Sequence, residues 1–235
     1  MNRFQWIFFD ADGTLFDYEQ AEANALQGTF HDMALDFSPD YAAAYQTINH
    51  QIWLDFEAGR ISSTDLRVAR FERLFTALAL AQDPQAFSDR YLYNLSQQGG
   101  LMPGARQLVE TLAGSFHMTI ITNGLSDVQR PRLAKSTIQP YFEGVFISEE
   151  MGVSKPDPAY FAAVFTALAG HPQPPTHETT LVVGDSLSSD IQGGLNAGLA
   201  TCWFNPAQKP ANPRIPATFT IQNLEDLYSL LRQPL

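Results

Sequence analysis

Short apolar runs recur along the second half of the chain and alternate with segments of helical periodicity. From about residue 101 onward the runs are Met118–Thr122, Val145–Ser148, Leu181–Val183 and Leu199–Phe204. The helix-like segments beside them include Gly104–Ala113, Pro158–Leu168 and Leu187–Ala197. A similar apolar run, Phe4–Phe9, lies near the start. Because strand–helix alternation is typical of βαβ units, the pattern predicts an α/β fold with a Rossmann-like, doubly wound parallel sheet.

Residues 17–100 follow a different pattern, with clear helix starts and no convincing strand. The helix starts pair an N-cap residue with a proline or an acidic residue: Ser38-Pro39, Ser62 with Asp65, and Asp83-Pro84. One apolar helix face is formed by Phe71, Leu74, Phe75 and Leu78. We therefore expect an inserted unit of four helices at 17–100, with a discontinuous core at 1–16 and 101–235. Phe16-Asp17 and Gln97–Gly100 would be the connections.

Two kinds of side chain in this predicted helical unit could contact a ligand. Arg67, Arg70 and Arg73 recur at i, i+3 and i+6, but a solvated face with ion pairs is favoured for at least two of them. Aromatic residues such as Trp53 and Tyr91 could stack on a ring of that ligand, although packing in the core is their commoner fate.

The charge of the chain narrows the classes of partner. It has 25 acidic and 14 basic residues and a formal net charge of −11. This argues against non-specific binding to nucleic acid or to anionic membranes, but it allows a small anionic substrate if a metal ion supplies positive charge. There is one cysteine, Cys202, and no internal disulfide. No bilayer-spanning stretch and no secretory signal are recognisable, so a soluble cytoplasmic protein is expected.

Two carboxylates, Asp10 and Asp12, follow the first apolar run. In open α/β sheets ligands bind at the carboxyl ends of the strands. Two neighbouring carboxylates repel each other unless a cation holds them, and oxygen ligands suit Mg²⁺, which also binds substrate phosphates. One carboxylate could attack an electrophile while the other transfers a proton. The alternative is an acidic loop that caps the next helix.

Two further polar sites follow the second and third predicted strands. Thr122-Asn123-Gly124, with Ser126 beyond it, could bind an anion through a hydroxyl and free backbone N–H groups, or it could be a simple turn. Lys155 precedes a helix near Pro158, where its charge opposes the helix dipole. This conflict suggests an anionic partner, and the alternative is an exposed, solvated lysine.

A second acidic pair, Asp185 and Asp190, follows the run Leu181–Val183. A helix N-cap would explain Asp185 but not Asp190. In the helix expected after the second site, Pro131 should cause a kink or a late start. None of the five histidines has a sequence spacing that suggests a metal site.

Taken in order, these sites resemble the haloacid dehalogenase-like superfamily of phosphohydrolases. The superfamily motifs D-x-D-x-T, Thr or Ser, Lys and G-D-x-x-x-x-D stand here as Asp10–Thr14, Thr122, Lys155 and Gly184–Asp190. The chain is more similar still to bacterial 5'-nucleotidases of this superfamily that act on pyrimidine nucleoside monophosphates. The stretches that carry this second resemblance are Trp6–Asp12, Trp53–Phe71, Ile147–Pro156 and Gly193–Trp203.

The resemblance implies a role for each motif residue. Asp10 would attack phosphorus and form an aspartyl-phosphate, and Asp12 would protonate the leaving group and then activate water. Thr122 and Lys155 would bind the phosphoryl oxygens, in a substrate-binding segment that includes Asn123 and Gly124.

The implied cofactor is Mg²⁺. Asp10, Asp185 and the backbone carbonyl of Asp12 would hold the ion, and Asp190 would orient a water bound to it. The helical unit at 17–100 would be a cap that closes over the site. The expected partner is a small phosphorylated metabolite, a nucleoside monophosphate in the first instance, and the expected assembly is a monomer or a small homo-oligomer.

Other activities of the superfamily fit the sequence less well. Asp12 disfavours a dehalogenase, because haloalkanoate chemistry needs no protonation of the leaving group. A phosphonatase would use a cap lysine, and residues 17–100 contain none. A phosphoglucomutase remains open. The main alternative is a phosphatase for small sugar phosphates or phosphoglycolate. A non-catalytic binding protein on the same fold would be expected to have lost an acidic or lysine position, and all are present.

Overall fold

The computed structural model describes residues 3–232, so residues 1–2 and 233–235 of the predicted core lie outside the described part. The chain divides into two compact units. One takes in the described residues up to Asp17, Gly100–Ser126 and the residues from Leu133 on. The other comprises Tyr18–Gly99 together with Asp127–Arg132. The sequence prediction places residues 127–132 in the core, whereas here they group with the helical unit.

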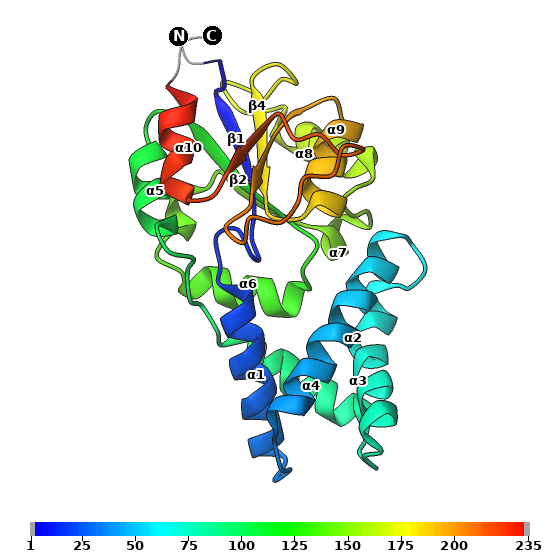
Figure 1. The fold of residues 1–235 in the computed structure, drawn as a ribbon. Coiled ribbons are helices and arrows are strands. Elements are labelled where there is room, and N and C mark those ends of the chain that lie inside the picture. Colours follow the sequence, from blue (N-terminus) through cyan, green and yellow to red (C-terminus); the bar gives the residue numbers. More distant parts are fainter. Residues whose placement is uncertain (1–2, 233–235) are drawn as a thin grey trace. The chain divides into compact units, whose positions relative to one another are not determined.

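A six-stranded, all-parallel sheet forms the first unit, which confirms the predicted α/β fold class (Figure 1). Its spatial order is β3-β2-β1-β4-β5-β6. The strands are β1 (Trp6–Asp10), β2 (His117–Thr122), β3 (Gly144–Ile147), β4 (Thr180–Gly184), β5 (Ala200–Phe204) and β6 (Phe219–Ile221). The edge strand β6 is missing from the sequence prediction, because three residues carry too little periodicity to be recognised.

Helices cover both faces of this sheet, which explains why the central strands β1 and β4 are buried along their whole length. Alternate residues of β1 point to opposite faces. Ile7 and Phe9 pack with α5 (Ala105–Leu112) and α10 (Leu224–Leu231). On the other face Trp6 and Phe8 pack with α8 (Pro158–Leu168). Shorter helices follow the strands: η1 (Gln139–Tyr141), α7 (Ser148–Met151), the π-helical turn η2 (Leu187–Ile191) and α9 (Gln192–Asn196).

The second unit is built from four helices. They are α1 (Tyr18–Asp32), α2 (Pro39–Glu57), α3 (Ser63–Leu78) and α4 (Pro84–Ser96). Ser38, Ser62 and Asp83 are the N-caps of the last three, and each side chain accepts a backbone N–H of the first turn. The three helix starts expected from the sequence are therefore confirmed.

The cap arginines divide into two groups. Arg67 pairs with Asp127 at 2.6 Å and Arg73 pairs with Asp55 at 3.2 Å, so these two form ion pairs as the sequence suggests. Arg70 is different, because it is 1% exposed and lies over the ring of Tyr91, 5.1 Å from its centroid. Tyr91 itself is fully buried, which agrees with the expectation of core packing.

Helix α6 (Ser126–Lys135) begins at Ser126 and contains Pro131 in its interior. The alternative of a late helix start is therefore wrong. Proline has no N–H, so one bond of the helical ladder is absent there. Among the described residues, no helix combines the length and the apolar character that crossing a membrane requires.

A buried carboxyl group lies at the centre of the helical unit. Glu22 is 7% exposed, and its Oε1 accepts a hydrogen bond from Nδ2 of Asn49 at 2.6 Å. Burial raises the pKa of Glu22 to about 7, although hydrogen bonds from Tyr18 and Asn49 and the charge of Arg70 oppose the rise. The folded protein therefore holds a proton on Glu22 at pH values where the unfolded chain has released it.

We expect Glu22→Gln to change the pH dependence of stability. The folded pKa is raised above the unfolded value of 4.5, so wild type loses stability as the pH rises from the unfolded pKa through the folded one. That loss amounts to up to about 3 kcal/mol for a shift of this size. In urea unfolding at about pH 5 and pH 8 the variant should gain on wild type as the pH rises. Glu72→Gln, at an exposed position of α3, is the control. A Glu22→Gln difference that is the same at both pH values would contradict the account.

Candidate active site

The functional groups predicted from sequence lie at the carboxyl ends of three neighbouring strands. β1 lies between β2 and β4, so the chain order reverses around it, and such a reversal creates a ligand crevice at the carboxyl end of the sheet. Asp10 is the last residue of β1 and pairs with Ile121 of β2. Thr122 ends β2 and Gly184 ends β4.

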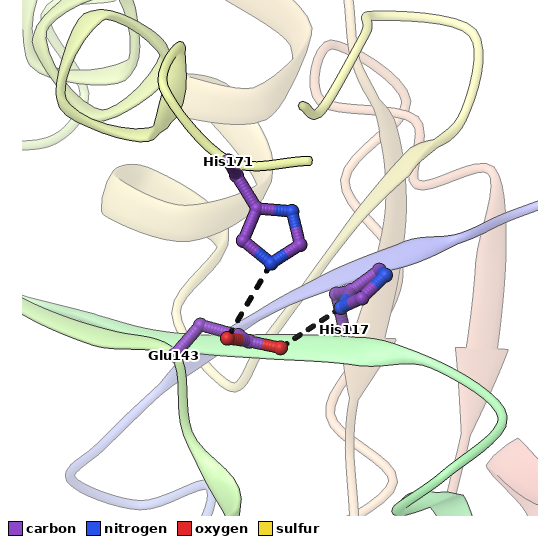
Figure 2. Close-up of side chains that lie close together, drawn as sticks. All are labelled: His117, Glu143 and His171. Atoms are coloured by element: carbon purple, nitrogen blue, oxygen red, sulfur yellow. Dashed lines mark hydrogen bonds and ion pairs between the residues drawn. The ribbon is translucent and has the colours of Figure 1, made fainter. Parts of the chain in front are cut away.

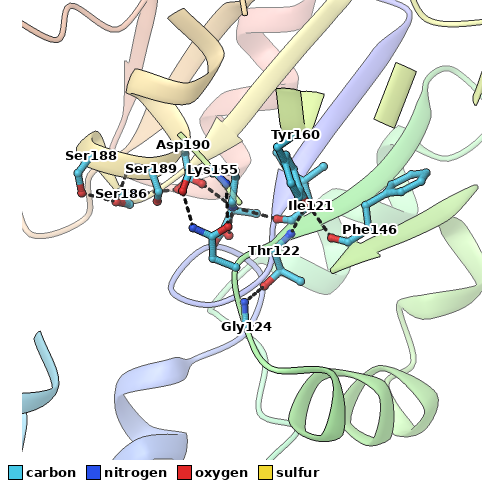
Figure 3. A network of polar contacts seen from close by, with 12 residues as sticks. Ile121, Thr122, Gly124, Phe146, Lys155, Tyr160, Ser186, Ser188, Ser189 and Asp190 are labelled. Carbon is cyan, nitrogen blue, oxygen red and sulfur yellow. Dashed lines mark hydrogen bonds and ion pairs between the residues drawn. The ribbon is translucent and has the colours of Figure 1, made fainter. Parts of the chain in front are cut away.

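Lys155 lies at the centre of a buried polar network (Figure 3). Its Nζ donates to Oδ1 of Asp10 at 2.7 Å, to Oδ1 of Asp190 at 2.7 Å, and to the carbonyl of Ile121 at 3.1 Å. These bonds use the three donors of an ammonium group. With 1% exposure, Lys155 is not the solvated lysine of the alternative interpretation. Burial alone would lower its pKa, but Asp10 and Asp190 outweigh this effect and raise it, so the lysine is charged.

The loop after β2 positions this lysine. Asn123 forms two hydrogen bonds with the backbone of Lys155, one from the lysine N–H to Oδ1 at 2.9 Å and one from Nδ2 to the carbonyl at 2.8 Å. The N–H of Gly124 donates to Oγ1 of Thr122 at 3.0 Å. Thr122-Asn123-Gly124 is therefore more than a turn, because its hydrogen bonds hold the backbone of Lys155 against the end of β2.

Tyr160 completes this arrangement, and the sequence analysis does not single it out. Its hydroxyl accepts the N–H of Thr122 at 3.0 Å and donates to the carbonyl of Phe146 at 2.7 Å (Figure 3). It thereby joins the ends of β2 and β3. In the sequence pattern of α8, Tyr160 takes the place of an ordinary residue of the apolar face. Only its hydroxyl group indicates a further role.

The last motif is held by a π-helical turn rather than by a regular helix start. Asp190 lies in η2, and its Oδ2 accepts the N–H of Ser186 at 3.0 Å. A Cβ at Gly184 would collide with the carboxyl group of Asp190. The sequence prediction of one helix over Leu187–Ala197 is thus replaced by η2 followed by α9, and π-helical turns are frequent at functional sites.

A glycine in the segment Asp10–Thr14 allows this loop to lie close to Asp185 of the segment Gly184–Asp190. Gly13 has φ +85°, and a Cβ there would lie 2.6 Å from Oδ2 of Asp185. Its N–H donates to the carbonyl of Phe16 at 2.9 Å, which closes the loop after β1. Asp12 is partly exposed in this loop. It is not among the three clustered carboxylates described next.

Asp10, Asp185 and Asp190 together offer a binding site for a hard cation. Their oxygens lie within 4.8 Å of one another. Burial, together with the charge of Asp190, raises the pKa of Asp10 well above its ordinary value and that of Asp185 to about 7, although Lys155 opposes both shifts. One ammonium thus faces three carboxyl groups. Oδ2 of Asp10 is buried and makes no hydrogen bond.

This donor set fits Mg²⁺. The ion prefers oxygen ligands and binds through one or two carboxylates while keeping several waters. A divalent cation would also neutralise the excess negative charge and would give the unbonded Asp10 oxygen a partner. That the backbone carbonyl of Asp12 joins these groups stays a prediction.

Comparison with known proteins shows the family that the sequence resembles. The family model for haloacid dehalogenase-like hydrolases matches residues 4–198. The pyrimidine 5'-nucleotidase PynA of Streptococcus pneumoniae is 34% identical over 97% of this chain and 95% of its own length. The pyrimidine 5'-nucleotidase YjjG of Escherichia coli is 36% identical over 97% of this chain and 98% of its own length.

A solved structure extends the likeness to the whole fold. The HAD-hydrolase YfnB of Bacillus subtilis, whose crystal structure was determined with bound magnesium, is 38% identical. The two folds superpose with a TM-score of 0.92 over 98% of this chain and 100% of that one.

Proposed function

Since the chain belongs to the haloacid dehalogenase-like hydrolase family and is a phosphoric monoester hydrolase, we propose that its substrates are pyrimidine nucleoside 5'-monophosphates. We further propose that Asp10 acts as nucleophile with Mg²⁺ bound beside it. The observation that supports this chemistry best is the position of Lys155 between the carboxylates of Asp10 and Asp190. Two relatives named pyrimidine 5'-nucleotidases, each matched over nearly its full length, support the choice of substrate.

In the first step a carboxylate oxygen of Asp10 forms a bond to phosphorus. The bond between phosphorus and the ester oxygen breaks, and the nucleoside leaves with a proton from Asp12. In the second step water, deprotonated by Asp12, attacks the phosphorus of the aspartyl-phosphate. The bond between phosphorus and the Asp10 oxygen breaks, which releases inorganic phosphate and restores the Asp10 carboxylate. A carboxylate nucleophile thus divides one difficult displacement into two easier ones.

Residues around Asp10 hold it ready for attack. Its backbone is fixed in the sheet opposite Ile121, and Lys155 fixes Oδ1 at 2.7 Å. The same ammonium lies where it offsets the negative charge of an incoming phosphoryl group, and the hydroxyl of Thr122 lies on the neighbouring strand end. Such preorganised charge in a dry site supplies a large share of the rate in phosphoryl transfer.

Asp10 and Asp185, with the carbonyl of Asp12, would hold the Mg²⁺ ion, and Asp190 would orient water beside it. When bound, the ion supplies positive charge that neutralises the phosphoryl oxygens and the crowded carboxylates. Lys155 meanwhile keeps Asp190 in place through a second bond of 2.7 Å.

We expect Asp12→Ala to affect substrates according to their leaving groups. A nucleoside leaves as a basic alkoxide and needs a proton, so its kcat/KM should fall by about 10²–10⁴-fold. p-Nitrophenyl phosphate releases a weakly basic phenolate and should lose much less. Initial rates for both substrates, at Mg²⁺ concentrations saturating for each variant, give the comparison. Equal losses on the two substrates would argue against a role for Asp12 as acid.

A side-by-side substrate panel tests the proposed specificity. UMP, CMP and dTMP should show a higher kcat/KM than AMP and GMP, which carry the same phosphate on a purine nucleoside. Sugar phosphates and phosphoglycolate complete the panel. If one of these exceeded every pyrimidine nucleotide, the nucleotidase proposal would fail, whereas the assignment as a phosphatase would stand.

A further inference from the structure

A second polar cluster lies at the amino-terminal end of β2 (Figure 2). It consists of His117, Glu143 and His171, whose ligand atoms all lie within 4.8 Å of one another. His117 begins β2, Glu143 directly precedes β3, and His171 lies beyond α8. The active site described above uses the other end of β2, at Thr122, so the two clusters are separate.

The carboxylate of Glu143 divides its two oxygens between the two imidazoles. Oε1 lies 2.8 Å from Nδ1 of His117, and Oε2 lies 3.6 Å from Nε2 of His171. A tetrahedral ion with bonds of about 2.1 Å holds its ligand atoms about 3.4 Å apart. The two distances lie on either side of this value, and no two ligand atoms of the cluster are more than 4.8 Å apart.

Gln173 fixes the outer nitrogen of each ring. Its side-chain Oε1 lies 3.2 Å from Nε2 of His117, and its backbone oxygen lies 3.0 Å from Nδ1 of His171. Histidine ligands of metals almost always donate their other ring N–H to an oxygen in this way. Both rings thus have an oxygen acceptor on the outer side, while His117 Nδ1 and His171 Nε2 face Glu143.

Backbone contacts hold these side chains in place. The N–H of Glu143 donates to the carbonyl of Met118 at 2.8 Å, and the N–H of His171 donates to the carbonyl of Leu168 at 3.0 Å. Indole Nε1 of Trp6 donates to the backbone oxygen of Gln173 at 2.9 Å. The side chains of His117, Glu143 and His171 are 27%, 37% and 20% exposed, so an ion can reach them from solvent.

We propose that His117 Nδ1, His171 Nε2 and the carboxylate of Glu143 form a site for a divalent transition-metal ion of the zinc class. Two imidazoles and one carboxylate suit zinc, with water as a fourth ligand, and they suit Mg²⁺ poorly. The three carboxylates of the active site have the opposite preference. Bound metal would tie the loop that contains His171 and Gln173 to the start of β2 and so stabilise the fold.

The competing interpretation is an ordinary hydrogen-bonded cluster. The backbone N of Gln173 lies 3.1 Å from Nδ1 of His171. If Nδ1 accepts a hydrogen bond from this N–H, the ring proton is on Nε2, which then donates a hydrogen bond to Glu143. Metal binding requires the other tautomer, in which Nδ1 donates to the backbone oxygen of Gln173. The two interpretations differ in whether the cluster binds an ion at all.

Equilibrium dialysis of tag-free, metal-stripped protein against ZnCl₂ distinguishes a metal site from a hydrogen-bonded cluster. Excess Mg²⁺ is present to occupy the carboxylate site, and the pH is about 7.5, above the ordinary histidine pKa of about 6.5. We expect wild type to bind one equivalent of Zn²⁺, and Co²⁺ in its place to give the visible absorption of a tetrahedral site. Cys202 does not compete, because it is fully buried and burial raises the pKa of its thiol to about 12.

Variants locate the ion. His171→Ala and Glu143→Ala should lose this Zn²⁺ equivalent and the Co²⁺ absorption, whereas His31→Ala, at an exposed position of α1, should keep both. Gln173→Leu keeps the three ligands and should bind Zn²⁺ about 10–100-fold more weakly. Thermal unfolding without metal checks that each variant is folded. No Zn²⁺ bound to wild type in excess Mg²⁺, or unchanged binding in His171→Ala and Glu143→Ala, would overturn the proposal.

Discussion

Asp10→Asn is expected to fold like wild type and to lose at least about 10⁴-fold in kcat on every phosphomonoester. The carboxamide keeps the shape of the side chain and an oxygen that can accept from Lys155, which now lies 2.7 Å from Oδ1. It is too weak a nucleophile to form an acyl phosphate. Steady-state kinetics with UMP, together with the urea midpoint, separates the chemical loss from any loss of stability.

The matched control is Asp36→Asn, which makes the same change at an exposed position outside the site and should leave turnover unchanged. Turnover of Asp10→Asn within about tenfold of wild type would contradict the role of Asp10 as nucleophile. So would a loss that follows unfolding of the variant rather than slower chemistry in the folded state.

The second large effect is expected from Lys155→Met, which removes a cation that is bonded to two buried carboxylates, Asp10 and Asp190. Breaking a buried ion pair by removing one partner costs about 3–5 kcal/mol. The free energy of unfolding, measured without divalent cations at about pH 8, should fall by that amount. The deficit should shrink at lower pH, because the unpaired carboxyl groups then take up protons. The kcat/KM should also fall by about 10²–10³-fold or more.

Lys135→Met serves as the control, since this lysine is exposed and lies outside the carboxylate network. It should change the free energy of unfolding by less than about 0.5 kcal/mol. If Lys155→Met were as stable as this control at pH 8, the described ion pairs would not hold the site together.

Most of the fold follows from local patterns. The buried strands β1, β2 and β4 are short apolar runs, and the starts of α2, α3 and α4 carry recognisable caps. Two elements escape this kind of reasoning. The edge strand β6 has three residues, and the π-helical turn at Leu187–Ile191 is set by how Asp190 meets Gly184 and Ser186, which periodicity does not encode.

The sequence predicts most of the residues that meet at the candidate site, but neither Tyr160 nor the hydrogen bonds between them. Motif order places Asp10, Thr122 and Asp185 at or next to strand ends, because parallel strands bring their carboxyl ends to one edge, and it places Lys155 in the loop before α8. That Lys155 is buried against Asp10, 145 positions away in sequence, depends on tertiary packing. The same holds for the cap, where sequence favours solvated arginines and Arg70 is instead buried.

The cluster of His117, Glu143 and His171 shows most clearly what cannot be predicted from the sequence. His117 and His171 lie 54 positions apart, as their numbers show, and no ligand spacing connects them. They meet because β2 and the loop after α8 converge at one end of the sheet. Gln173 lies in a proline-rich stretch that sequence alone marks only as a surface loop. Its role becomes visible from the two oxygens that it directs at the two rings.

Chemical trapping tests the central claim, that Asp10 carries the phosphoryl group, most directly. Enzyme quenched during turnover of UMP and treated with borohydride should contain homoserine in place of Asp10, because borohydride reduces an acyl phosphate but not a free carboxylate. Mass spectrometry of the N-terminal peptide reads out the conversion, and enzyme without substrate should show none. Reduction at another carboxyl group, or an unmodified Asp10 in enzyme that is turning over and trapped under conditions that preserve acyl phosphates, would contradict the account.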